Sequence, residues 1–198
     1  MKKPGILILL ISVLSFAAQA QIGISKGLIG GLNLATIGGS DASGDAQSVN
    51  GFAGGVFLEL NIPGPFSIEA EGLYSQKGSK YSASVTTVTD TYTYVDIPIL
   101  LKYHFPYPAV KPYIYAGPSY SILLSANRRT EVAYASSVDT DVKSVIAASD
   151  VGAVIGIGVR FAIIRIDARY NLGLSTIDKS GSLKVYNRAA SLYAGIEF

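Results

Sequence analysis

Apolar and polar residues alternate with a period of two along most of this chain. In the clearest segment Phe66, Ile68, Ala70 and Tyr74 alternate with Ser67, Glu69, Glu71 and Ser75. Successive side chains of a β-strand point to opposite faces, so this period predicts strands with one apolar and one polar face. About eight such segments occur, which leaves little room for helices. They lie near residues 27–37, 51–62, 66–76, 92–105, 113–124, 150–161 and 163–175, and the last ends at Phe198.

The links between these segments alternate between long and short. The long, polar links cover residues 38–50, 77–91, 125–149 and 176–185, and the short ones cover 61–65, 106–112 and 161–163. Long loops at one rim and tight turns at the other are typical of an outer-membrane barrel whose two termini lie on the turn side. Strands of roughly 10 residues also match a tilted crossing of the bilayer core.

The composition indicates a surface that lies partly outside water. Charged residues make up 15% of the chain, against about 25% in soluble domains. Beyond the first 20 residues no apolar run is long enough for a spanning helix, so a membrane protein of this kind crosses with strands closed into a barrel. We therefore expect an all-β fold, an eight-stranded antiparallel up-and-down transmembrane β-barrel. The net charge of +2 is too small to indicate nucleic-acid binding.

The N-terminus has the pattern of a cleaved signal peptide. A basic Met1-Lys2-Lys3 precedes a mostly apolar stretch from Ile6 to Ala17, and Ala18-Gln19-Ala20 forms a small-residue cleavage site. A membrane anchor helix is the alternative, but the apolar stretch falls short of the roughly 20 residues needed to span a bilayer. We predict cleavage between Ala20 and Gln21, a signal peptide over residues 1–20 and one barrel domain over residues 21–198. The chain contains no Cys, which excludes disulfides and a lipid-modified Cys.

A secreted, lipocalin-like barrel with a greasy interior would show the same alternation, so the direction of the apolar face needs other evidence. The polar faces here are mainly Gly, Ser, Asn and Ala with few charges, whereas a soluble barrel needs charged residues across its outer face. The chain has no Trp and ends in an aromatic residue. These features favour the membrane barrel. Candidate residues for an interfacial aromatic belt are Tyr74, Tyr103, Tyr107 and Tyr170, although strand propensity explains many tyrosines equally well.

Four motifs, in this order, resemble the PorT-like outer-membrane β-barrel family. They are Gly30-Gly-Leu-Asn-Leu34, Ile97-Pro-Ile-Leu-Leu-Lys-Tyr103, Lys111-Pro-Tyr-Ile-Tyr-Ala-Gly-Pro118 and Arg169-Tyr-Asn-Leu-Gly-Leu-Ser175. The resemblance spans roughly residues 22–198. It implies an eight-stranded barrel and, through the family's founding member, a link to protein secretion. With the pattern of long and short links it predicts a location in the bacterial outer membrane with both termini periplasmic. It also implies insertion by the barrel-assembly machinery, which in related barrels recognises a C-terminal strand with a terminal aromatic residue. In this chain that signal comprises Leu192, Ala194, Ile196 and Phe198.

Charged residues of both signs fall on the expected inner face. They are Glu59, Glu69, Glu71, Asp96, Lys102, Arg160, Arg165, Asp167, Arg169 and Glu197. The interior of an eight-stranded barrel is just wide enough for side chains, so poorly hydrated charges there must pair. We expect a salt-bridged plug. The alternative is a gate that rearranges to pass ions.

The sequence offers little catalytic chemistry. His104 is the one histidine, and without Cys or a second His a metal site or another bound cofactor is not expected. No G-x-S-x-G motif accompanies it, so a Ser-His-Asp hydrolase is a minor alternative and we expect no enzyme.

The long links are the expected carriers of function. Residues 80–92 are rich in β-branched residues and contain no Gly or Pro, which predicts a hairpin that protrudes beyond the membrane; the case for residues 131–138 is weaker. A protruding edge can accept a partner strand; the alternative is a solvated loop that only shields the barrel. We therefore expect a structural or interaction barrel with outer-membrane lipid around it and a protein partner at its extracellular loops. A narrow pore for ions or small solutes is the alternative.

Overall fold

The computed structural model describes residues 23–42, 46–134 and 136–198. The predicted signal peptide and its cleavage site at Ala20 and Gln21 lie outside the described residues. A short 3-10 helix, η1, spans Lys143–Val145, and all other elements are strands. They are β1 (Gly23–Gly38), β2 (Val49–Asn61), β3 (Phe66–Ala83), β4 (Thr86–His104), β5 (Val110–Val132), β6 (Val138–Asp141), β7 (Ser149–Phe161), β8 (Ile164–Gly173) and β9 (Tyr186–Glu197). None of the described helices is long and apolar enough to cross a membrane.

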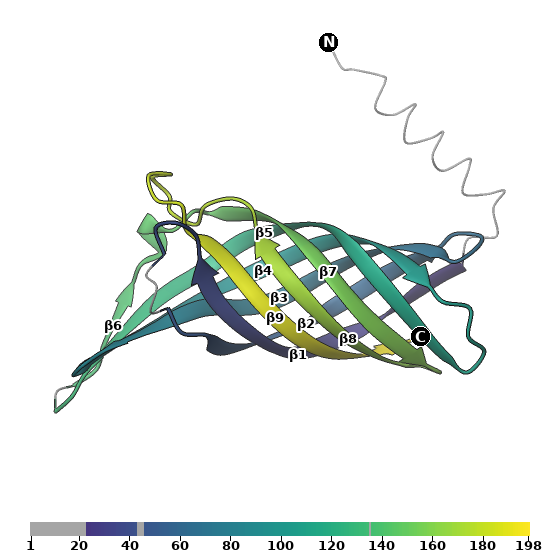
Figure 1. Cartoon of the computed structure of the whole chain (residues 1–198), viewed down its shortest axis with the longest axis horizontal. Coiled ribbons are helices and arrows are strands. Elements are labelled where there is room, and N and C mark those ends of the chain that lie inside the picture. The colour runs from purple at the N-terminus through teal and green to yellow at the C-terminus, as the bar shows by residue number, and fades with distance from the viewer. Residues whose placement is uncertain (1–22, 43–45, 135) are drawn as a thin grey trace, which may run out of the picture.

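Eight of the strands form a closed ring (Figure 1). β1 pairs with both β2 and β9, and β4 pairs with both β3 and β5, so the sheet has no free edge within the barrel. All pairings are antiparallel, and β6 lies outside the ring because it pairs only with β5. The predicted eight-stranded antiparallel up-and-down barrel is confirmed.

The apolar face of each strand points outward. Leu32, Ile155 and Leu192 are 69%, 64% and 60% exposed, whereas Asn33 and Glu69 on the other face are 2% and 0% exposed. A large exposed apolar band needs a cover other than water. This arrangement excludes the secreted, lipocalin-like barrel with an apolar interior, which the alternation alone could not exclude.

The three short links form tight turns at one end of the barrel, as the sequence predicts. The β7–β8 turn needs only two residues, and Ala162 adopts a positive φ of 50° there. Both ends of the described chain lie at this turn end, because Gly23 pairs with Asn61 and the amide of Glu197 donates to Ile163 O.

At the other end three strands continue past the ring and form a projection with β6, which we call the blade. It comprises residues 77–83 of β3, 86–93 of β4, 125–132 of β5 and 138–141 of β6, with the hairpin tips at residues 84–85, 133–134 and 136–137 (Figure 1). The hairpin between β3 and β4 extends to the Ala83–Thr86 pair, in line with the protruding hairpin expected from residues 80–92.

The expectation for the fifth strand was wrong at its far end. A strand ending near Leu124 and a long polar link over residues 125–149 were expected, but β5 continues to Val132. The register between β4 and β5 shifts at Thr93 and Tyr94, which pair with Ser125 and Leu123. A bulge of this kind adds one unpaired residue and inverts the alternation beyond it, so the period of two breaks where the strand continues.

Candidate functional site

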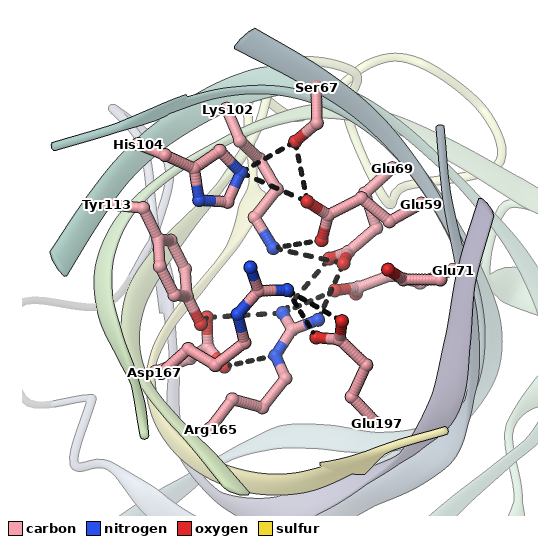
Figure 2. A network of polar contacts seen from close by, with 12 residues as sticks. Glu59, Ser67, Glu69, Glu71, Lys102, His104, Tyr113, Arg165, Asp167 and Glu197 are labelled. Carbon is pink, nitrogen blue, oxygen red and sulfur yellow. Dashed lines mark hydrogen bonds and ion pairs between the residues drawn. The ribbon is translucent and has the colours of Figure 1, made fainter. Parts of the chain in front are cut away.

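The lumen is filled by charged side chains that arrive from opposite walls of the barrel (Figure 2). Near the turn end, Lys102 Nζ lies 3.0 Å from Glu59 Oε2 and 3.0 Å from Glu69 Oε2. Ser67 Oγ donates to Glu59 Oε1 at 2.7 Å. Lys102 is 1% exposed, so its ammonium group depends on these carboxylates for compensation.

Arg165 connects the two sides of the ring. Its guanidinium donates to Glu69 Oε1 at 3.0 Å across the lumen and to Asp167 Oδ2 at 2.9 Å on its own strand. Tyr113 donates its hydroxyl to Asp167 Oδ1 at 2.8 Å. The guanidinium also lies 4.4 Å from the centroid of the Phe57 ring. Because β3 and β8 are on opposite sides of the ring, this ion pair ties together walls that share no hydrogen-bonded edge.

Arg169 makes a second cross-lumen pair, which is bidentate. Its Nη1 and Nη2 donate to the two oxygens of Glu71 at 2.7 and 3.0 Å. This fork geometry is the strongest form of an arginine–carboxylate contact. The Arg169 guanidinium also lies 4.4 Å from the centroid of the Tyr193 ring, so the cation contacts both an anion and an aromatic face.

The structure places all ten predicted charged residues on the inner face of the ring, and each of them makes an ion pair. Nine pair among themselves, including Arg160 with Glu197 at 2.6 Å near the turn end. Asp96 instead pairs with Lys77 at 3.0 Å.

Sequence reasoning missed Lys77, Asp150 and the buried Tyr113. Lys77 falls in the predicted link over residues 77–91, and Asp150 is the second residue of β7. The alternation could have identified Lys77, because every second residue of a strand lies on the same face. Lys77 continues the inward-facing series of Ser67, Glu69, Glu71 and Ser75.

An apolar cap closes the loop end of the lumen. It consists of the buried side chains of Ile37, Tyr92, Tyr94, Leu123, Ala126 and Ile177, and Val142, Ile146 and Val185 from the loop side pack against them. Ile177 and Val185 come from the β8–β9 loop, while Val142 and Ile146 flank η1. The cap therefore combines strand residues with two loops, and it lies above the charged network.

Little free space remains between the cap and the network. A small polar cavity there is lined by Lys77, Ser121, Asp150, Asn171 and Asn187 among others, and it has room for about one water molecule. Asp150 accepts hydrogen bonds from Ser175 Oγ at 2.8 Å and Asn187 Nδ2 at 2.9 Å. A polar cavity of this size suits one ordered water and is too small for a solute.

The single histidine lies in this network but is not placed for nucleophilic catalysis. Its Nε2 lies 2.8 Å from Ser67 Oγ and 3.0 Å from Glu59 Oε1, and its Nδ1 has no hydrogen-bond partner among the described residues. A Ser-His-acid relay needs the acid on one ring nitrogen and the hydroxyl on the other. Within the described part of the chain, no group of three or more His, Cys, Asp or Glu side chains could hold a metal ion.

A closed antiparallel barrel with an apolar outer band, long loops at one rim and tight turns at the other defines the class of outer-membrane β-barrel proteins. The chain belongs to the outer membrane protein beta-barrel domain family, whose model matches residues 16–179. It is thus an integral protein of the bacterial outer membrane. The match is to this general family, so membership of the PorT-like group stays a prediction.

Solved structures of several outer-membrane proteins are similar to this chain. Ail, the attachment invasion locus protein of Yersinia pestis, is 16% identical, with 88% of this chain and 99% of that chain covered and a TM-score of 0.46. Neisserial surface protein A is 20% identical, with 89% and 99% covered and a TM-score of 0.49. The N-terminal β-barrel domain of Pseudomonas aeruginosa OprF is 13% identical, with 87% and 99% covered and a TM-score of 0.35. No curated protein matches the chain.

Proposed function

We propose that this protein is a non-enzymatic outer-membrane barrel that serves a structural or interaction role through its extracellular loops. The observation that carries the proposal is the contrast between the two parts of the molecule. The lumen is occupied by paired charges and an apolar cap, while the blade presents unpaired strand edge and exposed apolar side chains. A rigid scaffold with a projecting recognition element is a common arrangement for binding.

The orientation belongs to the same proposal. The turn end, with both termini of the barrel domain, faces the periplasm, and the blade faces the outside of the cell. Short periplasmic turns and long extracellular loops are the rule in bacterial barrels. The resemblance to the PorT-like family supports a link to protein secretion, in which the blade would contact a protein of the secretion apparatus.

The tip of the blade has the features of a contact site. Val85, Val138 and Tyr134 are 59%, 60% and 108% exposed, and Tyr134 has a positive φ of 67°. The amide of Ala133 donates to Val85 O at 2.7 Å, which holds the two hairpin tips together. Next to this tip, β6 is paired on one side only among the residues that the structure describes. A free strand edge beside exposed apolar side chains suits a protein partner that adds a strand.

Crosslinking on intact cells tests this role. We expect a crosslinker placed at Ser137 to capture a specific protein, and we expect the double variant Tyr134→Ser, Val138→Asp to abolish the capture. Leu183→Ser is the matched control, because Leu183 is an exposed apolar residue of a different loop. The proposal fails if the blade captures nothing, or if the double variant captures the same protein as the wild type.

We also propose that Leu192, Ala194, Ile196 and Phe198 form the signal read by the barrel-assembly machinery. These side chains are every second residue of the segment and lie on the outer face, where Leu192, Ile196 and Phe198 are 60%, 51% and 67% exposed. The amide of Phe198 donates to Lys26 O at 2.8 Å, next to the seam between β9 and β1. Deleting Phe198 should lower the amount of folded barrel in outer membranes. Phe198→Tyr, which keeps an aromatic residue at this position, should leave that amount unchanged. Normal levels after the deletion would refute the assignment.

A further inference from the structure

The small polar cavity between the apolar cap and the charged network is lined by a buried carboxylate that lacks a cation. Asp150 lines this cavity and is 4% exposed. It accepts hydrogen bonds from Ser175 Oγ at 2.8 Å and Asn187 Nδ2 at 2.9 Å, but it makes no ion pair with any residue that the structure describes. A buried carboxylate without a compensating charge is strongly destabilising.

The cations next to this cavity do not supply the missing charge. Lys77 Nζ lies 3.0 Å from both carboxylate oxygens of Asp96 and pairs with that residue. Arg188 also lines the cavity, but it follows the buried Asn187 on β9, so its exposed side chain points to the outer face. The carboxylates of Asp96 and Asp150 thus face one ammonium group, and this layer of the lumen has a net charge of −1.

An amide oxygen without a partner is the second feature of this cavity. Asn187 lines it and is 4% exposed, and its Nδ2 donates to Asp150 Oδ2 at 2.9 Å and to Tyr94 Oη at 3.2 Å. A flipped amide would place its oxygen against the carboxylate, so Nδ2 faces Asp150. Asn187 Oδ1 is then buried without a hydrogen-bond partner among the described residues. A buried polar atom of this kind requires a ligand.

Two glycines keep the space beside these oxygens open. A Cβ at Gly152 would lie 2.9 Å from Ser119 Oγ, and a Cβ at Gly173 would lie 3.3 Å from Asp150 Oδ2. Ser119 and Ser121 add hydroxyl oxygens to the lining of the cavity. The lining therefore offers a carboxylate, an amide oxygen and two hydroxyls, which are the hard oxygen ligands that alkali and alkaline-earth cations prefer.

We propose that this cavity binds one monovalent metal cation, Na⁺, between Asp150 and Asn187. The net charge of −1 matches a single positive charge, and a dehydrated sodium ion fits a space of about one water molecule. A water molecule in the same place would leave the charge of Asp150 uncompensated. A divalent ion would need further carboxylates, and no group of three or more His, Cys, Asp or Glu side chains within the described ranges could hold one. The sodium ion ties β7 to β9, which share no hydrogen-bonded edge, directly beneath the cap.

Urea unfolding of the refolded barrel in a non-ionic detergent tests the proposal. Sodium chloride replaces N-methylglucamine chloride stepwise at constant ionic strength, so that only the identity of the cation changes. The wild type should unfold at a higher urea concentration in sodium. Well above the dissociation constant, each tenfold rise in sodium should raise the folding constant by about tenfold. Asp150→Asn removes the charged ligand and should unfold at the same urea concentration in both salts.

A second variant keeps the test decisive if Asp150→Asn does not fold. Asn187→Ser keeps the carboxylate but removes the amide oxygen, and it should need about tenfold more sodium for the same stabilisation. The matched controls are Asp139→Asn on β6 and Asn127→Ser on β5, because both residues are exposed and lie outside the cavity. Both controls should respond to sodium as the wild type does. Heat-modifiable mobility on gels verifies that each variant is folded.

Three results would overturn the proposal. If the wild type unfolds at the same urea concentration in sodium and in N-methylglucamine, the cavity holds water alone or Asp150 is protonated. If Asp150→Asn and Asn187→Ser both keep the full response, sodium binds elsewhere. If Asp139→Asn loses the response as Asp150→Asn does, the effect comes from the net charge of the protein. Capture of a partner by the blade does not depend on this cavity, so the proposed function stands or fails separately.

Discussion

At the scale of single residues, the interior is governed by the requirement that every buried charge has a partner. Glu69 and Asp167 are both 0% exposed, and both depend on Arg165. The alternation of the sequence predicted which charges point inward, because the face on which a residue lies depends only on its position within its own strand. It did not predict the partners, since Arg165 and Glu69 are 96 residues apart and only the closure of the ring brings them together.

Replacing Arg165 should be far more damaging than replacing an exposed arginine. Arg165→Met leaves the buried Asp167 without its ion-pair partner and leaves Glu69 with Lys102 alone, and it should lower the free energy of unfolding by about 3–5 kcal/mol. Arg129 pairs with Glu131, but both side chains are more than half exposed, so Arg129→Met should cost less than about 1 kcal/mol. Urea titration of the folded band on unheated gels measures both. Equal losses for the two variants would contradict the buried network.

At the scale of elements, the strands could be predicted where they cross the membrane, and beyond it only for the hairpin between β3 and β4. Inside the bilayer one face meets lipid and the other meets the lumen, so the period of two is strong from Phe66 to Gln76. In the blade the strands meet the cap, loops or water, so the contrast between their two faces falls. The far end of β5 was missed for this reason, together with the bulge near Leu124, which inverts the phase.

The hairpin between β3 and β4 should be separable from the barrel. Replacing Ser82–Thr87 with Asn-Gly joins Tyr81 to Val88, which pair in the present register, through a two-residue turn suited to a hairpin. Asp90 and its 2.7 Å contact with Arg128 remain in place. We expect unchanged heat-modifiable folding. If the shortened protein does not fold, the hairpin tip has a structural role and cannot serve only for recognition.

The β8–β9 loop should respond to acid through Asp178. Its carboxylate accepts from Ser180 Oγ at 2.6 Å, Leu183 N at 3.0 Å and Ser182 N at 2.9 Å. These hydrogen bonds, with that of Ser180 largest, lower the pKa of Asp178 below its ordinary value of 3.8. The ordered loop is therefore stabilised above that ordinary value and loses the stabilisation as the pH falls through the lowered pKa.

Nuclear magnetic resonance can follow this transition. The amide shifts of Ser182 and Leu183 should stay constant near neutral pH and move only in strong acid. In Asp178→Asn the same amides should show no such titration. If they moved at or above the ordinary pKa of an aspartate, the hydrogen-bonded geometry of the loop would be wrong.

At the scale of the whole molecule, the barrel is closed in two ways. The ring of eight strands has no free edge within the membrane band. The lumen contains cross-wall ion pairs at its centre and an apolar cap at its loop end. The sequence predicted the plug from the narrow interior of an eight-stranded ring. It did not predict the cap, because Ile177 and Val185 lie in a link whose fold over the lumen leaves no periodic signal.

Single-channel recording in planar bilayers tests the closed lumen most directly. The barrel is refolded, its heat-modifiable mobility is verified, and the current is recorded at both polarities. The ion-paired network and the cap predict no steady conductance after insertion. A steady conductance of the size expected for an open pore would contradict the account and would favour the narrow pore.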